Sequence, residues 1–111
     1  MRPRELVLRY MASFYGESPL TDLWSLLAED FSFTGPLYEF DSAPAYIEAL
    51  LSDPPGDARY RILETYENDH SVCLIYQFVK PGVQTTMVQI FETRGDKITR
   101  IRLIFNPALF K

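Results

Sequence analysis

The stretch from Trp24 to Leu51, WSLLAEDFSFTGPLYEFDSAPAYIEALL, decides the fold of this chain. It opens with apolar residues at helical spacing and continues into a short aromatic segment in which apolar and polar residues alternate. The segment turns at Gly35-Pro36 and leads into another helical pattern. The stretch therefore predicts helix, strand, turn and helix in quick succession, which we interpret as one wall of a ligand pocket.

Three helices are predicted from apolar residues that recur every three or four positions. The first covers residues 3–15 and the second residues 19–28. Asp41 or Ser42 caps the third, and Asp53-Pro-Pro-Gly ends it because consecutive prolines cannot continue a helix.

Strand patterns account for the rest of the chain. A short first strand is predicted over residues 31–37, and four longer runs are separated by short turns: ARYRILETYE, SVCLIYQFV, QTTMVQIFET and KITRIRLIFN. These four form an antiparallel meander. The order α-α-β-α-β-β-β-β indicates a single α+β domain, residues 1–111, with a curved and mainly antiparallel sheet wrapped around the helices.

Both faces of the predicted strands are apolar. In the second long run, one face carries Val72, Leu74, Tyr76 and Phe78 and the other Cys73, Ile75 and Val79. In the last run, Ile101, Leu103 and Phe105 are expected to oppose Ile98 and Ile104. Since a sheet with one wet face alternates apolar with polar residues, the second apolar face predicts a homodimer packed through the outer sheet face.

Composition excludes several function classes. The net charge of -4 opposes nucleic acid as a partner, because phosphate binding needs a basic surface. No run approaches the roughly 20 apolar residues of a membrane span. With His70 and Cys73 as the only residues of their types, neither a disulfide nor a metal site is expected, no cofactor is indicated, and a cytoplasmic location fits.

The element order, with LLAEDFSFTGPL entering the first strand and GDKITRIRLIFN forming the last, resembles the nuclear transport factor 2-like superfamily. Within that superfamily, the chain is most similar to SnoaL-like and ketosteroid isomerase-like proteins. The resemblance covers essentially the whole chain and implies a cystatin-like cone with a pocket at its wide end. It specifies fold better than activity, because one fold hosts many functions.

The resemblance also assigns roles to three positions. The helix tyrosine that donates to the substrate oxygen in steroid isomerases falls on Tyr10, and the second oxyanion donor falls on Gln89. The general base, an aspartate just before a proline, falls on Gly35. Because glycine cannot hold a proton, isomerisation by that route is not expected. The polyketide cyclase pattern likewise requires an acid that faces the pocket, whereas the last strand presents Ile101, Leu103 and Phe105 on its inward face.

A ligand pocket is predicted from residues expected to face inward. Tyr10, Tyr76 and Gln89 are polar and are either satisfied within the core or offered to a ligand. The other candidates are apolar or aromatic, and plain core packing also explains them: Phe14, Phe31, Phe33, Tyr38, Phe78, Met87, Phe91 and Leu103, with Trp24, Phe40 and Phe105 as further aromatic candidates.

Three function hypotheses follow. The first is a binding domain for a small apolar organic molecule. The second is a divergent isomerase or cyclase for a cyclic ketone, whose displaced acid or base would be Glu39 or Asp41, although a helix cap and a solvated charge explain these residues as well. The third is a protein-interaction module that holds a peptide on its sheet face or pocket rim.

Overall fold

A computed structural model of the chain describes residues 1–110. The helical elements are α1 (Pro3–Phe14), η1 (Leu20–Asp22), α2 (Leu23–Leu26), α3 (Ala43–Ser52) and η2 (Pro107–Phe110), of which η1 and η2 are 3-10 turns. The strands are β1 (Leu27–Thr34), β2 (Glu39–Phe40), β3 (Arg59–Glu67), β4 (Ser71–Lys80), β5 (Val83–Arg94) and β6 (Lys97–Ile104).

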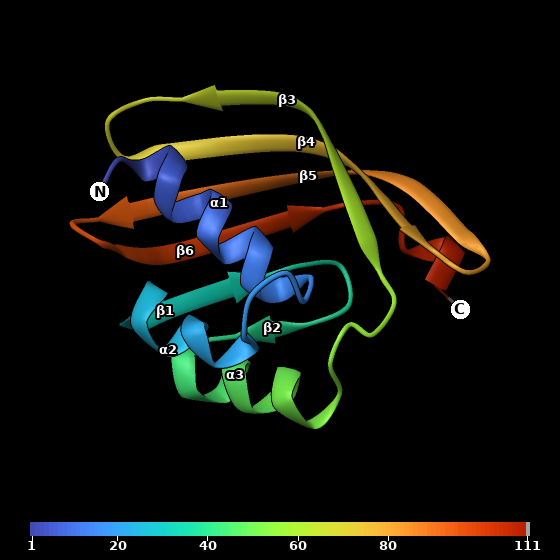
Figure 1. Cartoon of the computed structure of the whole chain (residues 1–111), viewed down its shortest axis with the longest axis horizontal. Coiled ribbons are helices and arrows are strands. Elements are labelled where there is room, and N and C mark those ends of the chain that lie inside the picture. Colours follow the sequence, from blue (N-terminus) through green and yellow to red (C-terminus); the bar gives the residue numbers. More distant parts are fainter. Residues whose placement is uncertain (111) are drawn as a thin grey trace.

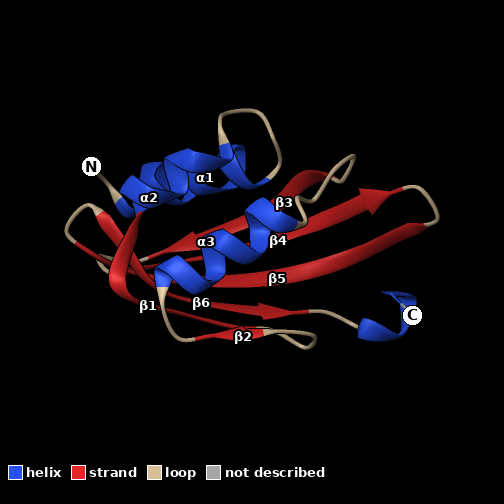
Figure 2. Ribbon diagram, turned by 90° about the horizontal axis from the view of Figure 1, so that it is seen from below, coloured by secondary structure: helices blue, strands red, loops and turns tan. Residues whose placement is uncertain are grey.

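The strands form one curved, open sheet in the order β2-β1-β6-β5-β4-β3. The meander from β3 to β6 is antiparallel, whereas β1 pairs with β6 in parallel, so the sheet is mixed (Figure 1). All three α-helices lie on the concave face (Figure 2). The predicted α+β architecture, with helices wrapped by a mainly antiparallel sheet, is confirmed.

Capping at α3 follows the sequence closely. The Ser42 side chain accepts a hydrogen bond from the Ala45 backbone N–H at 3.2 Å, and Pro44 occupies the first turn, where its missing N–H leaves no bond unmade. Ser42 is therefore the cap, and Asp41 lies outside the helix. α3 consequently starts at a fixed point, which places Tyr46 on its buried side.

The predicted second helix is too long. Helical structure ends at Leu26, and β1 begins at Leu27 rather than at Phe31, because Leu27 already pairs with Ile98 of β6. Sheet pairing thus overrides the helical spacing of residues 27 and 28. The two-residue strand β2 was not predicted, since its pairing of Phe40 with Phe33 leaves no periodic signal.

The predicted orientation of Ile98 is wrong. Ile98 and Ile101 are both fully buried on the concave side. The register between β5 and β6 shifts at Glu92, so that Thr99 is an extra residue, and its hydroxyl donates to the Glu92 carbonyl at 3.2 Å. This bulge changes the parity of β6 and turns Ile98 inward.

The alternation predicted for β4 is confirmed. Val72, Leu74, Tyr76 and Phe78 are buried against the helices, whereas Val79 is exposed on the convex side. Among the described residues, no helix has the length and apolar character that crossing a membrane requires.

Candidate functional site

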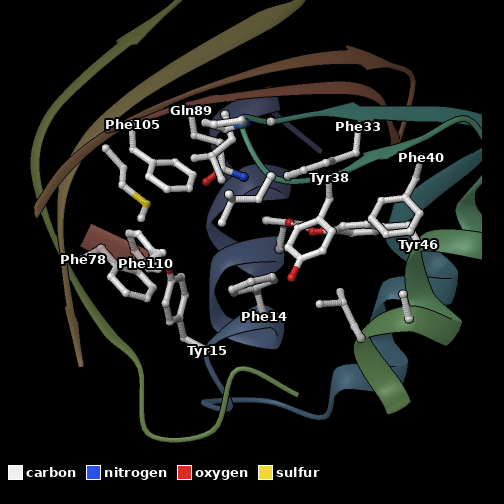
Figure 3. A pocket seen from close by; sticks show the side chains of 18 of the residues that line it. Phe14, Tyr15, Phe33, Tyr38, Phe40, Tyr46, Phe78, Gln89, Phe105 and Phe110 are labelled. Carbon is white, nitrogen blue, oxygen red and sulfur yellow. Dashed lines mark hydrogen bonds between the residues drawn. The ribbon is translucent and has the colours of Figure 1, made fainter. Parts of the chain in front are cut away.

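A cavity of about 490 Å³ opens between the concave sheet face, the C-terminal ends of α1 and α3, and η2. Its size falls in the range of small-molecule sites, about 300–1,000 Å³. Aromatic side chains from distant parts of the sequence converge on it (Figure 3). The predicted site residues that line it are Tyr10, Phe14, Phe33, Tyr38, Tyr76, Phe78, Met87, Gln89 and Leu103.

Two predicted pocket residues lie deeper, in the core. Phe31 and Phe91 are fully buried and do not line the cavity. Phe91 packs edge-on against Tyr10 with ring centroids 5.4 Å apart, and Phe31 contacts Tyr46 at 5.2 Å. They support the rings that do line the cavity. Trp24 is 47% exposed and lies outside the cavity wall.

The inner end of the cavity carries a set of phenols and one amide. The Tyr10 hydroxyl on α1 and the Tyr46 hydroxyl on α3 are hydrogen-bonded to each other. The Tyr76 hydroxyl on β4 donates to Gln89 Oε1 on β5 at 2.7 Å. Every buried side-chain nitrogen and oxygen in residues 1–110 has at least one hydrogen-bond partner.

Burial keeps these phenols protonated. Desolvation is the largest cause of the raised pKa of Tyr10, followed by the neighbouring Tyr46, while Gln89 acts in the opposite direction. Burial likewise raises the pKa of Tyr15 and Tyr46, and it raises the pKa of Tyr76 to about 12. At neutral pH the phenols are therefore hydrogen-bond donors and cannot act as bases.

The Tyr10–Tyr46 pair has one more hydroxyl hydrogen than the bond between the two residues uses. Each phenol carries one hydrogen and can also accept. The bond between the two hydroxyls uses one of the two hydrogens. Both residues line the cavity, so a ligand acceptor that contacts the pair would meet a hydrogen that the bond between the two hydroxyls does not use.

The walls around this polar end are aromatic. Phe33 stacks on Tyr46 with ring centroids 5.0 Å apart, and Phe14 stacks on Tyr10 at 6.0 Å. Tyr38 is 65% exposed and stands at the mouth in the loop after β1. Flat apolar rings pack well between such walls, because offset and edge-on aromatic contacts are both favourable.

Gly35 lines the cavity directly after β1, and its N–H donates to the Tyr38 carbonyl at 2.9 Å. A Cβ at this position would stand 3.1 Å from the ring edge of Phe33 and 3.7 Å from Leu103 Cβ. Gly35, to which the resemblance assigned the general-base position, thus lines the cavity and carries no proton-transfer group.

The charged residues at the cavity differ from those expected. Glu39 and Asp41 are exposed and lie outside the cavity wall. Asp53, which follows α3, and Lys80, the last residue of β4, line it instead. No group of three or more His, Cys, Asp or Glu side chains in the described part of the chain could hold a metal ion.

Sequence reasoning also missed three aromatic residues of the cavity. Tyr46 lies on the buried face of α3, but nothing in the sequence marks its bond to Tyr10. Tyr15 lies at the end of α1, where helical spacing is ambiguous. Phe110 belongs to η2, which was not predicted, and its ring lies 4.9 Å from that of Phe105.

The comparisons with known proteins agree on the fold. No protein-family model matches the sequence, and no curated protein matches it. An NTF2-like protein of unknown function from Cytophaga hutchinsonii aligns over 100% of this chain and 96% of its own, with a TM-score of 0.83 and 23% identity.

Two further similar structures come from an enzyme and from a member of a defined protein family. An LEH-like epoxide hydrolase from M. tuberculosis aligns over 92% of this chain and 80% of its own, with a TM-score of 0.79 and 15% identity. A protein of the SnoaL-like family from Agrobacterium tumefaciens aligns over 94% and 97%, with a TM-score of 0.73 and 15% identity. These similarities show a shared NTF2-like fold.

Proposed function

We propose that this chain, which has the NTF2-like fold, is a binding domain for a small and largely apolar organic molecule that carries a hydrogen-bond acceptor. The observation that carries the proposal is the Tyr10–Tyr46 hydroxyl pair, with one uncommitted hydrogen at the inner end of an aromatic cavity. The cavity volume and the aromatic walls support a ligand that contains a single ring or two fused rings.

A matched pair of probes tests the proposal. Methyl naphthyl ketone presents a carbonyl oxygen, and isopropenylnaphthalene has the same shape without an acceptor. We expect the ketone to bind more tightly by about 0.5 to 1.5 kcal/mol, the contribution of one hydrogen bond. The Tyr10→Phe/Tyr46→Phe double variant should remove this preference, whereas Tyr66→Phe on the exposed face should keep it. Equal affinity of the native protein for both probes would contradict the proposal.

A second candidate function is catalysis on a cyclic ketone. It is favoured by one observation, the presence of the Asp53 carboxylate on the same cavity as the phenol pair. In this reading a tyrosine hydroxyl polarises the ligand carbonyl, and Asp53 removes a proton from the adjacent carbon and returns it to another position of the ring. Gly35 leaves no base at the position used by steroid isomerases.

Three single variants separate the possible bases. Asp53→Asn should abolish turnover of a cyclic β,γ-unsaturated ketone while the ketone still binds. Asp41→Asn and Glu39→Gln should keep turnover, since these side chains lie outside the cavity wall. If the loss occurs in Asp41→Asn or Glu39→Gln instead, the segment from β2 to the start of α3 supplies the base. Unchanged turnover in all three would exclude a displaced carboxylate.

We also propose that the protein forms a homodimer through the convex sheet face. Ile75, Val88 and Ile104 are register neighbours across β4, β5 and β6 on this face, and Ile104 is 56% exposed. Such a row of branched apolar side chains is costly in water, and a second copy of the chain presents the same row in return.

The proposal further places the protein in the cytoplasm. Cys73 is a free, half-buried thiol, and burial raises its pKa above the ordinary value, so the protonated form is favoured. A reducing compartment keeps such a thiol intact. Expression as a fusion with a fluorescent protein would test the location.

A further inference from the structure

Lys80 occupies an unusual position in the fold. On β4 the concave face carries Leu74, Tyr76 and Phe78, and Lys80 continues the same alternation at the mouth of the cavity. Lys80 is a half-buried residue on an otherwise apolar face, where its methylene stem packs on apolar surface and its ammonium group stands at the edge. No carboxylate in residues 1–110 forms an ion pair with Lys80.

The ammonium group is nevertheless held in place. Lys80 Nζ lies 5.1 Å from the centroid of the Phe110 ring, a cation–π contact. Phe110 is itself packed against Phe78 at 5.5 Å and against Phe105 at 4.9 Å. In Figure 3, Phe78, Phe105 and Phe110 gather on one side of the cavity, away from Tyr46. The positive charge is thus positioned at the rim by residues that satisfy none of its hydrogen bonds.

We infer that the ligand is an organic carboxylate, in which an apolar ring body separates an acceptor at the Tyr10–Tyr46 pair from an anionic group bound by Lys80. This inference deepens the proposed function and rests on it. The ammonium supplies up to three N–H donors to a carboxylate, and a partly desolvated pair of opposite charges is stronger than one in open water.

Asp53 places a negative charge at the mouth of the cavity. It is the other charged residue of the cavity wall and lies after α3, on a different wall from Lys80. Its carboxylate repels an anion, so the ligand carboxylate is directed to the β4 side. The same arrangement would attract an amine to Asp53, and the experiment is therefore designed to separate a carboxylate from an amine.

Three probes of one shape test the inference: a hydroxynaphthylacetic acid, its primary amide and the corresponding hydroxynaphthylethylamine. Binding is measured by titration calorimetry at neutral pH and low salt. We expect the acid to bind about tenfold more tightly than the amide, as for a charge-assisted hydrogen bond, and the amine to bind most weakly.

Matched variants locate the effect. Lys80→Gln should remove the preference for the acid while the amide still binds, which also shows that the variant is folded. Lys97→Gln changes the net charge equally, but Lys97 lies on β6 outside the cavity, where it bonds to the Ser25 carbonyl, so the preference should remain. Asp53→Asn should strengthen binding of the acid, by about two- to fivefold for a partly exposed charge.

The outcomes distinguish a failure of the carboxylate inference from a failure of the proposed binding function. If acid and amide bind the native protein equally, or if Lys80→Gln weakens both equally, the carboxylate inference is overturned and the proposed binding function stands. A preference for the amine that Asp53→Asn removes also overturns it. If none of the three probes binds, the proposed function fails for a ligand of this shape, and the inference fails with it.

Discussion

The hydroxyl groups of Tyr10 and Tyr46 are hydrogen-bonded to each other, although the residues lie 36 positions apart and belong to different helices. The bond joins the buried faces of α1 and α3 beneath the cavity. It therefore contributes to the stability of the empty protein as well as to the site, and the two contributions are separable by experiment.

Removing this bond should give non-additive effects on stability. Tyr10→Phe and Tyr46→Phe are each expected to lower the free energy of unfolding by about 1 kcal/mol, because either change removes the same buried bond. The double variant should lose little more than either single variant, which is measured by urea unfolding in a double-mutant cycle. Tyr66→Phe, a change at a 57% exposed phenol, serves as the control. Fully additive losses would show that the two hydroxyls act independently.

Alkaline pH should destabilise the protein in a defined window. An unfolded tyrosine ionises near its ordinary pKa of 10, whereas burial raises the pKa of Tyr76 to about 12 and that of Tyr10 well above its ordinary value. Above pH 10 the unfolded state therefore binds fewer protons than the folded state, and the free energy of unfolding falls as pH rises.

The measurement for this prediction combines unfolding curves with phenolate absorbance. Stability should be insensitive to these phenols below pH 10 and should fall between pH 10 and 12 as a result of them. The buried phenols should ionise together with unfolding. Smooth titration of all seven tyrosines without loss of folded structure would contradict the burial-based pKa directions.

Gly35→Asp should introduce a base into the cavity. The backbone there has no left-handed strain, and the new Cβ would need only a small shift of the Phe33 ring, which it approaches to 3.1 Å. We expect isomerisation of a cyclic β,γ-unsaturated ketone to exceed that of Gly35→Asn by about 10²-fold or more, the usual contribution of a general base. Equal rates in the two variants would mean that residue 35 does not reach the ligand.

A charge on the convex face should separate the proposed homodimer. Ile104→Glu is expected to shift the sedimentation coefficient from dimer to monomer at micromolar concentration with an unchanged far-ultraviolet spectrum. Leu51→Glu, at a 44% exposed residue on α3, should leave the dimer intact. Cys73, which pairs with Ile90 on the convex face, should react faster with a thiol reagent in the Ile104→Glu variant. A native protein that sediments as a monomer would remove the proposal.

The meander could be predicted because local signals agree along it. Each strand has apolar residues with period two, and glycine or asparagine stands at the turns; Gly82 and Gly95 have φ values of 82° and 59°. The prediction failed where pairing between distant segments decided the structure. Leu27 is extended because β6 pairs with it, and Ile98 turns inward because of the bulge at Thr99.

In the candidate site, too, residues placed by a local pattern could be predicted and residues placed by tertiary packing could not. Tyr76 and Gln89 could be placed on the concave face because strand parity is a local property. The bond between Tyr10 and Tyr46 depends on how two helices cross, which no spacing encodes. Asp53 belongs to the predicted helix stop and Lys80 follows the predicted strand SVCLIYQFV, so no sequence pattern marks either residue as a charge at the cavity mouth.

The parallel pairing of β1 with β6 has a consequence for how the chain folds. Phe33 is the register partner of Ile101, so residues from the first third of the chain are paired with a strand from its final fifteen residues. During synthesis, β1 has no β6 neighbour until β3, β4 and β5 have also been made. Closing so long a loop is entropically costly and slows folding relative to helical proteins of similar size. The backbone N–H and C=O groups on this edge of β1 therefore stay unpaired until β6 is made, and β6 joins β1 to the meander.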